Sequence, residues 1–294
     1  MTTPNFESVT ALVADASRTV VAEIESALKG LGLRNVRATA SLAQTTQRLG
    51  ETPCDLLVIG SEWPDGNVSE LITAARHGEA GGNPFLGVVV TGPDNKSPDA
   101  GFIMRHGAEE FITPPFAAAG LLRCLETLIG SRKPFVVTSD YVGPDRRGGE
   151  GRASLIPLLD VPNTLREKIG GTYDADAATR AIAAMMVEIN IQKLQRHVEK
   201  VGILINRVAP DMMVDGVDEK VRTFLEELVF VADDIAHRVK GTHFDAVVTS
   251  CGQLVSVAKV VHKRNGVPKT KELNRLLDAA QAVMKGFAAA TVGG

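Results

Sequence analysis

Short apolar runs alternate with amphipathic stretches between residues 8 and about 130. The runs with a strand-type pattern cover Thr10–Ala14, Val36–Ala40, Leu56–Ile59, Leu86–Thr91 and Glu110–Thr113. The stretches with a helical pattern cover Thr19–Leu31, Ser41–Leu49, Ser69–His77, Pro98–Arg105 and Ala117–Ile129. This alternation predicts an α/β doubly wound (βα)5 domain, with a parallel sheet between two layers of helices. The third and fourth runs are apolar almost throughout, which is typical of strands covered on both faces.

Turn-forming residues interrupt the alternation from residue 131 to about 175. The segment Gly143–Gly149 is rich in glycine and arginine, and apolar residues become rarer. We therefore predict a linker over residues 131–175, with one short helix at Thr164–Ile169. The basic residues of its first part, 131–152, are Arg132, Lys133, Arg146, Arg147 and Arg152. A solvated tether accounts for them, and a docking strip for an acidic partner or a phosphate ligand is the alternative.

Beyond residue 175 the spacing of the apolar residues becomes helical. Apolar positions recur at steps of three and four from Ala184 to Val208, and Pro210 is expected to end this helix. Three further helices are predicted. The first ends at Gly241, the second runs from about Thr242 to His262, and the third covers Thr270–Phe287. Residues 176–294 therefore predict an all-α four-helix bundle. Whether the Ala184–Val208 stripe packs within the chain or forms a homodimer with a second copy stays open at this stage.

Composition narrows the class of protein. The 294 residues suffice for two domains with separate cores, and the hydrophobic content of 44% and charged content of 23% are typical of soluble globular proteins. The net charge of −3 gives no general reason to expect nucleic acid or a membrane as partner. The N-terminus lacks a leader pattern, and no apolar run reaches the roughly 18 residues of a membrane span, so a cytoplasmic protein is expected. Cys54, Cys124 and Cys251 are widely spaced, as buried thiols in a reducing compartment would be.

The loop after the third apolar run carries the most informative position. The run Asp55–Ile59 is followed by Gly60, and Trp63 and Pro64 come soon after. In doubly wound folds, ligand chemistry lies outside the carboxyl ends of the strands. A glycine at this place brings no side chain to that chemistry.

Residues 8–130 resemble the receiver domain of bacterial response regulators. The resemblance rests on three segments, Leu12–Asp15, Val88–Gly92 and Gly107–Phe116, at the ends of the predicted strands. The family's functional positions correspond here to Asp15 for one of the acids that hold Mg²⁺, Gly60 for the phosphoacceptor, Thr91 for the switch hydroxyl, Phe111 for the switch aromatic and Pro114 for the phosphate-binding lysine.

The departures from the family pattern decide the expected chemistry. Phosphoryl transfer needs a nucleophilic carboxylate, a metal held by other carboxylates and a cation to offset developing charge. Gly60 cannot supply the nucleophilic carboxylate, and Pro114 cannot supply the cation. Asp15 alone is a poor Mg²⁺ site. We therefore predict a pseudo-receiver without metal or cofactor that acts through docking. An acceptor displaced to Glu62 or Asp65 is the alternative.

Three further residues near this pocket allow two interpretations each. Thr91 and Phe111 could move together as in true receivers, or they could be strand-end residues packed under a loop. Trp63, the only tryptophan, could anchor a partner or cover the vacated pocket.

The segment His237–Gly241 resembles the signature of histidine phosphotransfer (Hpt) domains, which are also four-helix bundles. The resemblance implies a phosphorylatable His237, with Lys240 to neutralise the phosphoryl group and Gly241 to leave room for a receiver. Ordinary helix ending explains the same residues, since histidine and lysine are favoured in a last turn and glycine just after it. The resemblance requires His237 to lie in the middle of an exposed helix.

These patterns favour a non-catalytic adaptor or regulator of a two-component pathway, with histidine kinases or receiver domains as partners. The alternative is a phosphorelay intermediate that uses His237. A helix-turn-helix signature with a basic recognition helix is absent from the sequence, so nucleic acid is not an expected partner.

Overall fold

The computed structural model describes residues 5–146 and 156–293. The chain divides into two compact units, residues 1–189 and residues 190–294. This division differs from the domains predicted at 1–130 and 176–294, because the first unit contains the whole described part of the predicted linker. Each unit is described by itself.

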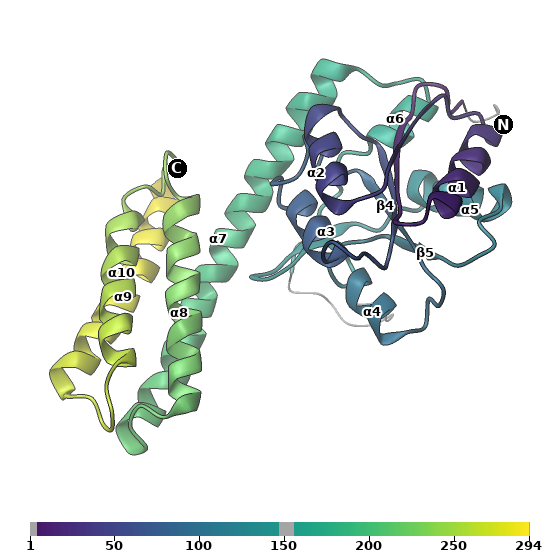
Figure 1. Ribbon diagram of the computed structural model, residues 1–294. Coiled ribbons are helices and arrows are strands. Elements are labelled where there is room, and N and C mark those ends of the chain that lie inside the picture. Colours follow the sequence, from purple (N-terminus) through teal and green to yellow (C-terminus); the bar gives the residue numbers. More distant parts are fainter. Residues whose placement is uncertain (1–4, 147–155, 294) are drawn as a thin grey trace. The chain divides into compact units, whose positions relative to one another are not determined.

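A parallel five-stranded sheet forms the centre of the first unit (Figure 1). Its strands are β1 (Thr10–Ala14), β2 (Asn35–Thr39), β3 (Leu56–Gly60), β4 (Gly87–Thr91) and β5 (Glu110–Ile112). They lie in the order β2-β1-β3-β4-β5, which is the doubly wound order of flavodoxin and CheY. Every residue of β3 and β4 is buried, as their continuous apolar character predicts. The predicted (βα)5 receiver-like architecture is therefore confirmed.

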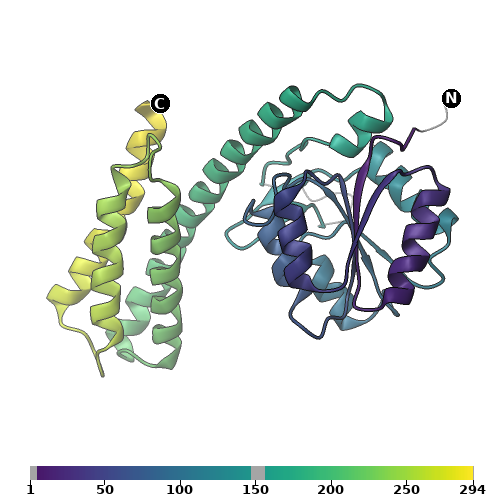
Figure 2. The ribbon, with the colours of Figure 1, turned by 45° about the horizontal axis from the view of Figure 1, so that its top comes forward.

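Two layers of helices cover this sheet (Figure 2). The helices are α1 (Arg18–Gly30), α2 (Leu42–Glu51), α3 (Val68–Arg76), α4 (Pro98–Met104) and α5 (Ala118–Gly130). On one face, Leu28 of α1 and Leu121 of α5 pack on the sheet, and on the other face Leu71 of α3 and Ile103 of α4 do so. The local signals act as expected: the Ser97 hydroxyl caps α4 by accepting from the backbone of Ala100 at 3.1 Å.

The segment of residues 131–175 is folded where it is described, which corrects the predicted flexible linker. It contains β6 (Phe135–Val137) paired antiparallel with β7 (Val142–Pro144), and α6 (Thr164–Ile169) lies where it was predicted. Phe135 also bridges to Leu159. The three residues of β6 and the three of β7 are buried. This segment is therefore part of the body of the first unit.

Buried charges attach the segment to the amino ends of the strands. Arg132 donates two hydrogen bonds of 2.7 Å to the two carboxylate oxygens of Glu109, the residue just before β5. Arg76, at the end of α3, lies 3.0 Å from the same carboxylate and donates to three backbone carbonyls. Their side chains are only 0 to 8% exposed. Both guanidinium groups lie over the Phe135 ring, about 5 Å from its centre.

A second buried ion pair is formed at the same edge. Lys168 of α6 lies 2.7 Å from the carboxylate of Asp55, the residue just before β3. The expectation that the basic residues of this segment are solvated is thus wrong for Arg132, and Arg146 also donates to the backbone of Ala108. Lys133 is exposed as expected, and Arg147 and Arg152 lie outside the described residues.

Helices dominate from residue 175 onward, which confirms the predicted helical C-terminal region. They are α7 (Ala175–Val214), α8 (Glu219–Arg238), α9 (Val247–His262) and α10 (Thr270–Gly293). Pro210 lies inside α7 instead of ending it, and Thr242 precedes α9 by several residues instead of capping it. No described helix is both long enough and apolar enough to cross a membrane.

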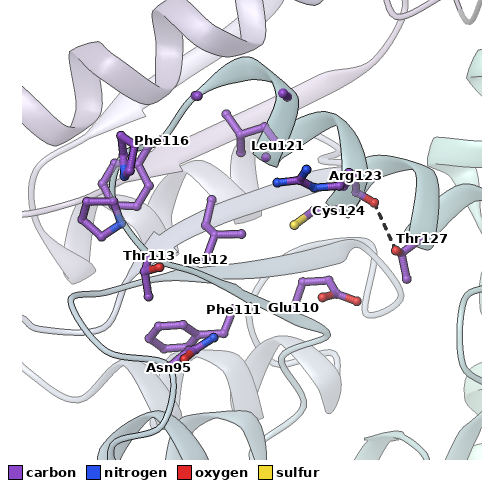
Figure 3. A pocket seen from close by; sticks show the side chains of 15 residues that line it. Asn95, Glu110, Phe111, Ile112, Thr113, Phe116, Leu121, Arg123, Cys124 and Thr127 are labelled. Atoms are coloured by element: carbon purple, nitrogen blue, oxygen red, sulfur yellow. Dashed lines mark hydrogen bonds between the residues drawn. The ribbon is translucent and has the colours of Figure 1, made fainter.

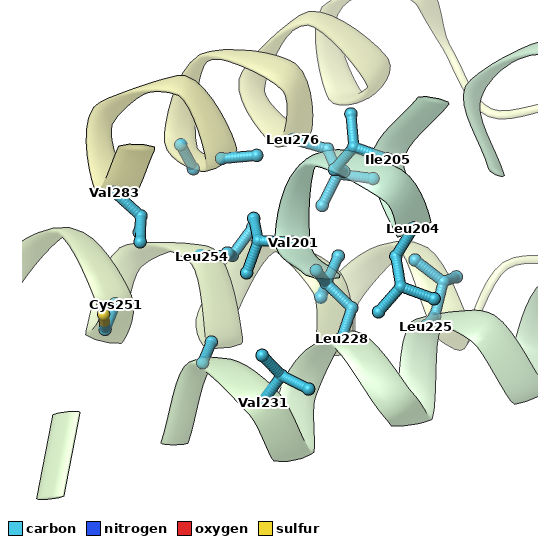
Figure 4. Close-up of a cluster of buried hydrophobic side chains, with 14 of the residues drawn as sticks. Val201, Leu204, Ile205, Leu225, Leu228, Val231, Cys251, Leu254, Leu276 and Val283 are labelled. Atoms are coloured by element: carbon cyan, nitrogen blue, oxygen red, sulfur yellow. The ribbon is translucent and has the colours of Figure 1, made fainter. Parts of the chain in front are cut away.

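One hydrophobic core holds the helices of the second unit together (Figure 4). Figure 4 shows Val201 and Ile205 of α7 facing Leu228 of α8, Leu254 of α9 and Val283 of α10. Within the predicted apolar stripe, Leu194, Val201, Ile205 and Val208 are therefore buried within their own chain, and Val198 is partly buried against the same core. Its first residue, Ala184, and the neighbouring Val187 belong to the first unit and are exposed. The buried part of this stripe is not a free surface for a second copy.

Candidate functional site

Asp15 and Gly60 meet at the carboxyl edge of the sheet. Strands β1 and β3 are neighbours, with Ala14 opposite Ile59, so the residues that follow approach each other. A Cβ atom added at Gly60 would lie 2.4 Å from Oδ2 of Asp15 and 3.0 Å from its Cγ. The Asp15 carboxylate thus occupies the space into which a phosphoacceptor side chain would project.

The backbone holds the Asp15 carboxylate in this place. Its Oδ1 accepts a hydrogen bond of 2.7 Å from the amide of Ser17, the residue that caps α1. Burial raises the pKa of Asp15, the Ser17 amide opposes this, and the nearby charge of Glu62 adds to the rise. The Asp15 carboxyl group therefore holds its proton more tightly than an ordinary aspartate does.

The other acids of this loop do not join Asp15. Asp65 accepts a hydrogen bond of 3.0 Å from the amide of Leu42 at the start of α2, and Glu62 is exposed. Within residues 5–146 and 156–293, no group of three or more His, Cys, Asp and Glu residues is arranged to hold a metal ion. Among the described residues, Glu62 and Asp65 therefore do not form such a group with Asp15.

Thr91 is the last residue of β4, and Phe111 is the middle residue of β5. Thr91 lies opposite Gly60 in the sheet and is buried, and its hydroxyl finds no hydrogen-bond partner among the described residues. The ring of Phe111 lies against Gly92, where an added Cβ would meet it at 2.7 Å. This close approach, together with the Ser61 hydroxyl oxygen at 2.5 Å from the same added Cβ, explains why a glycine follows Thr91.

Trp63 covers the edge of β3. Its indole nitrogen donates a hydrogen bond of 2.7 Å to the carbonyl of Gly60, and its half-buried ring packs against the core on the α3 and α4 side. The hydrogen bond to Gly60 favours the interpretation in which Trp63 covers the pocket, and not the one in which it anchors a partner.

A hollow of about 560 Å³ runs beside β5 and α5 (Figure 3). Pro114, the residue at the family's lysine position, lines it and is exposed, and the peptide bond between Pro114 and Pro115 is cis. Figure 3 shows Glu110 of β5 and Arg123 of α5 in this hollow, with the Thr127 hydroxyl bonded to the Arg123 carbonyl at 3.1 Å. Burial raises the pKa of Glu110, and the Lys133 charge opposes this. The hollow thus combines apolar walls with two chargeable side chains.

His237 lies one residue before the end of α8. It is exposed, and its Nδ1 lies 2.8 Å from the carbonyl of Asp233 one turn earlier. Lys240 and Gly241 follow the helix, and Gly241 has φ of +73° as a residue that ends a helix does. The mid-helix position that phosphotransfer would require is therefore absent. Ordinary helix ending accounts for all three residues.

The sequence did not reveal the buried cluster of Arg76, Glu109 and Arg132. These residues are distant in the chain, and charged residues are normally expected at the surface. One available signal was the cluster of Phe135, Val136 and Val137, a short apolar run in a segment otherwise interpreted as a linker.

No protein-family model matches the sequence, and no curated protein matches it. A solved structure of a protein from Neptuniibacter caesariensis is 15% identical, with a TM-score of 0.38, over 42% of this chain and 88% of its own. The chemotaxis response regulator CheY4 of Vibrio cholerae is 18% identical, with a TM-score of 0.36, over 40% of this chain and 96% of its own. A third solved structure is RcsB from Salmonella enterica serovar Typhimurium, bound to promoter rprA in the presence of phosphomimetic BeF3-. It is 18% identical, with a TM-score of 0.36, over 41% of this chain and 67% of its own. The doubly wound fold of the first unit rests on its own strand order and register.

Proposed function

We propose that this chain is a response-regulator-like signalling protein whose first unit binds a partner protein without accepting a phosphoryl group. The observation that carries the proposal is the Asp15 carboxylate in the space of a residue-60 side chain. The position opposite Thr91 then has neither a nucleophilic oxygen of its own nor room for one. The chain has no catalytic role in this proposal, and its partners are other two-component proteins of the cytoplasm.

The hollow beside β5 and α5 supports a docking role. Within the described part of the chain, strand β5 pairs with β4 alone, and its residues line this hollow. An edge strand beside a partly apolar hollow is a common place for a partner segment to bind. At the amino edge of the sheet, Glu109 and Asp55 are already paired with Arg132 and Lys168, so this edge does not compete for the docking role.

The second unit supplies a further element of the proposal. We propose that it is a four-helix bundle that presents its outer surface to a partner, since its apolar stripe is already buried. Phe230 of α8 is an exposed aromatic residue of that surface, at 64% exposed.

Phosphorylated histidine kinases from the same organism test the proposal. Each purified kinase is first autophosphorylated with labelled ATP and then mixed with the full chain. We expect one of them to form a complex while the label stays on the kinase. We also expect Arg123→Glu in the hollow to weaken that complex, with Arg18→Glu outside the hollow as the matched control. Label that moves to this chain would overturn the proposal, and so would the absence of any complex across the whole set of kinases.

A further inference from the structure

A second cavity of about 510 Å³ lies on the α3 and α4 side of the carboxyl edge. It is bounded by the loop after β3, the start of α3, and the loop between β4 and α4. Its size is within the range of small-molecule sites. It is separate from the hollow beside α5, and only Phe111 lines both.

The charged residues that line this cavity have one sign. Glu62, Asp94 and Asp99 line it, and none of its described lining residues is a lysine, arginine or histidine. None of these three carboxylates forms an ion pair with a described residue, whereas the buried acids Asp55 and Glu109 each do. A cavity in which the charged lining groups are carboxylates attracts cations and repels anions such as phosphate.

Aromatic rings form part of the same wall. Trp63, Phe102 and Phe111 line the cavity, and Phe102 is 46% exposed. The faces of aromatic rings attract organic cations, most strongly in the case of tryptophan. Carboxylates and aromatic rings around one cavity are a combination suited to a cation that carries apolar groups.

A buried hydroxyl adds an independent observation. Ser69, in the first turn of α3, lines the cavity and is only 1% exposed. Its Oγ has no hydrogen-bond partner in the described part of the chain. The Oγ atom itself is buried, so the Ser69 side chain would have to turn toward the cavity to accept a hydrogen bond from an N–H group of a bound ligand.

We propose that this cavity binds a guanidinium or alkylammonium group carried on an apolar stem. The charged group is held by Glu62, Asp94 and Asp99, and the stem lies against the aromatic rings. A metal ion fits less well, because the three carboxylates do not form a metal-ligand group. The same chemistry is carried by a small free amine and by an arginine or lysine side chain of a partner protein. The inference does not depend on whether the chain is phosphorylated.

Trp63 makes the proposal directly testable, because it is the only tryptophan of the chain and it lines the cavity. The full chain is titrated with agmatine, with the peptide acetyl-Gly-Arg-Gly-amide, and with the same peptide carrying uncharged citrulline in place of arginine. We expect a saturable change of Trp63 emission with agmatine or the arginine peptide, and none with the citrulline peptide. The tighter of the two cationic ligands identifies the source, a free amine or a protein side chain.

Matched variants complete the test. Asp94→Asn combined with Asp99→Asn keeps the shape of both side chains and is expected to weaken binding at least about tenfold. Glu126→Gln removes an exposed charge of α5 outside the cavity and is expected to leave binding unchanged. Equal responses to the arginine and citrulline peptides, no response to either cationic ligand, or unchanged affinity in a folded double variant would overturn the proposal. Circular dichroism establishes that the double variant is folded.

Discussion

The Asp15 carboxylate lies where a side chain at residue 60 would begin, with Oδ2 only 2.4 Å from an ideal Cβ on Gly60. Gly60 brings no side chain to this edge of the sheet, and the space in front of it holds the Asp15 carboxylate. An aspartate at residue 60 would require Oδ2 and Cγ of Asp15 to shift, and the hydrogen bond from the Ser17 amide to Oδ1 opposes that shift. The two residues form one packed unit.

This contact predicts an energetic coupling between the two positions. Gly60→Ala should destabilise the first unit by about 0.5–1.5 kcal/mol, the usual net contribution of one hydrogen bond, because the Asp15 carboxylate must shift and strain its bond to the Ser17 amide. In an Asp15→Ala background the cost should fall, because Oδ2 and Cγ are gone. Urea unfolding followed by Trp63 fluorescence measures both values in the first unit alone, since the second unit has no tryptophan. Equal costs in the two backgrounds would show that the contact is absent.

The raised pKa of Asp15 predicts a pH dependence. Burial raises this pKa above its ordinary value of 3.8, with Glu62 as a further cause, so the folded state binds the proton more tightly than the unfolded state. The stability that Asp15 contributes is then complete below pH 3.8 and is lost as the pH rises through the folded pKa. Asp15→Asn should therefore be more stable than the wild type at neutral pH and lose this advantage in acid. Urea midpoints across this pH range measure the difference, and parallel curves would contradict the prediction.

Glu109 predicts a large effect at the opposite edge of the sheet. Glu109→Gln leaves Arg76 and Arg132 buried without their shared anion, which should cost about 3–5 kcal/mol. Glu51→Gln is the matched control, because it breaks an exposed pair with Arg48 and should cost less than about 1 kcal/mol. Trp63 fluorescence during urea unfolding reports both values. Similar small costs would mean that the buried cluster does not hold the 131–175 segment in place.

The same cluster predicts where the first unit can be cut. A fragment of residues 1–130 loses Arg132, Phe135 and Lys168, and leaves Arg76, Glu109 and Asp55 without these partners. We expect this fragment to unfold at a lower urea concentration than residues 1–189, or to aggregate. Equal midpoints for the two fragments would restore the linker interpretation of residues 131–175.

The sequence predicted the sheet well because its signals are local. Strand β1 was predicted with its observed bounds, and the serine cap and proline of α4 act on neighbouring residues. The 131–175 segment was missed because its attachment depends on long-range pairs, such as Lys168 with Asp55. The sequence shows directly that residue 60 has no side chain. It could not predict that the Asp15 carboxylate lies in front of Gly60, since this depends on the register of β1 and β3.

The most direct test of the central claim uses a small phosphodonor, which needs no matching kinase. The full chain is incubated with acetyl phosphate and Mg²⁺, and its intact mass is measured beside that of a receiver with an ordinary acceptor aspartate. We predict that the control gains a phosphoryl group and that this chain does not, because the site opposite Thr91 is filled by Asp15. An acyl phosphate on this chain, mapped to Asp15, Glu62 or Asp65, would contradict the account.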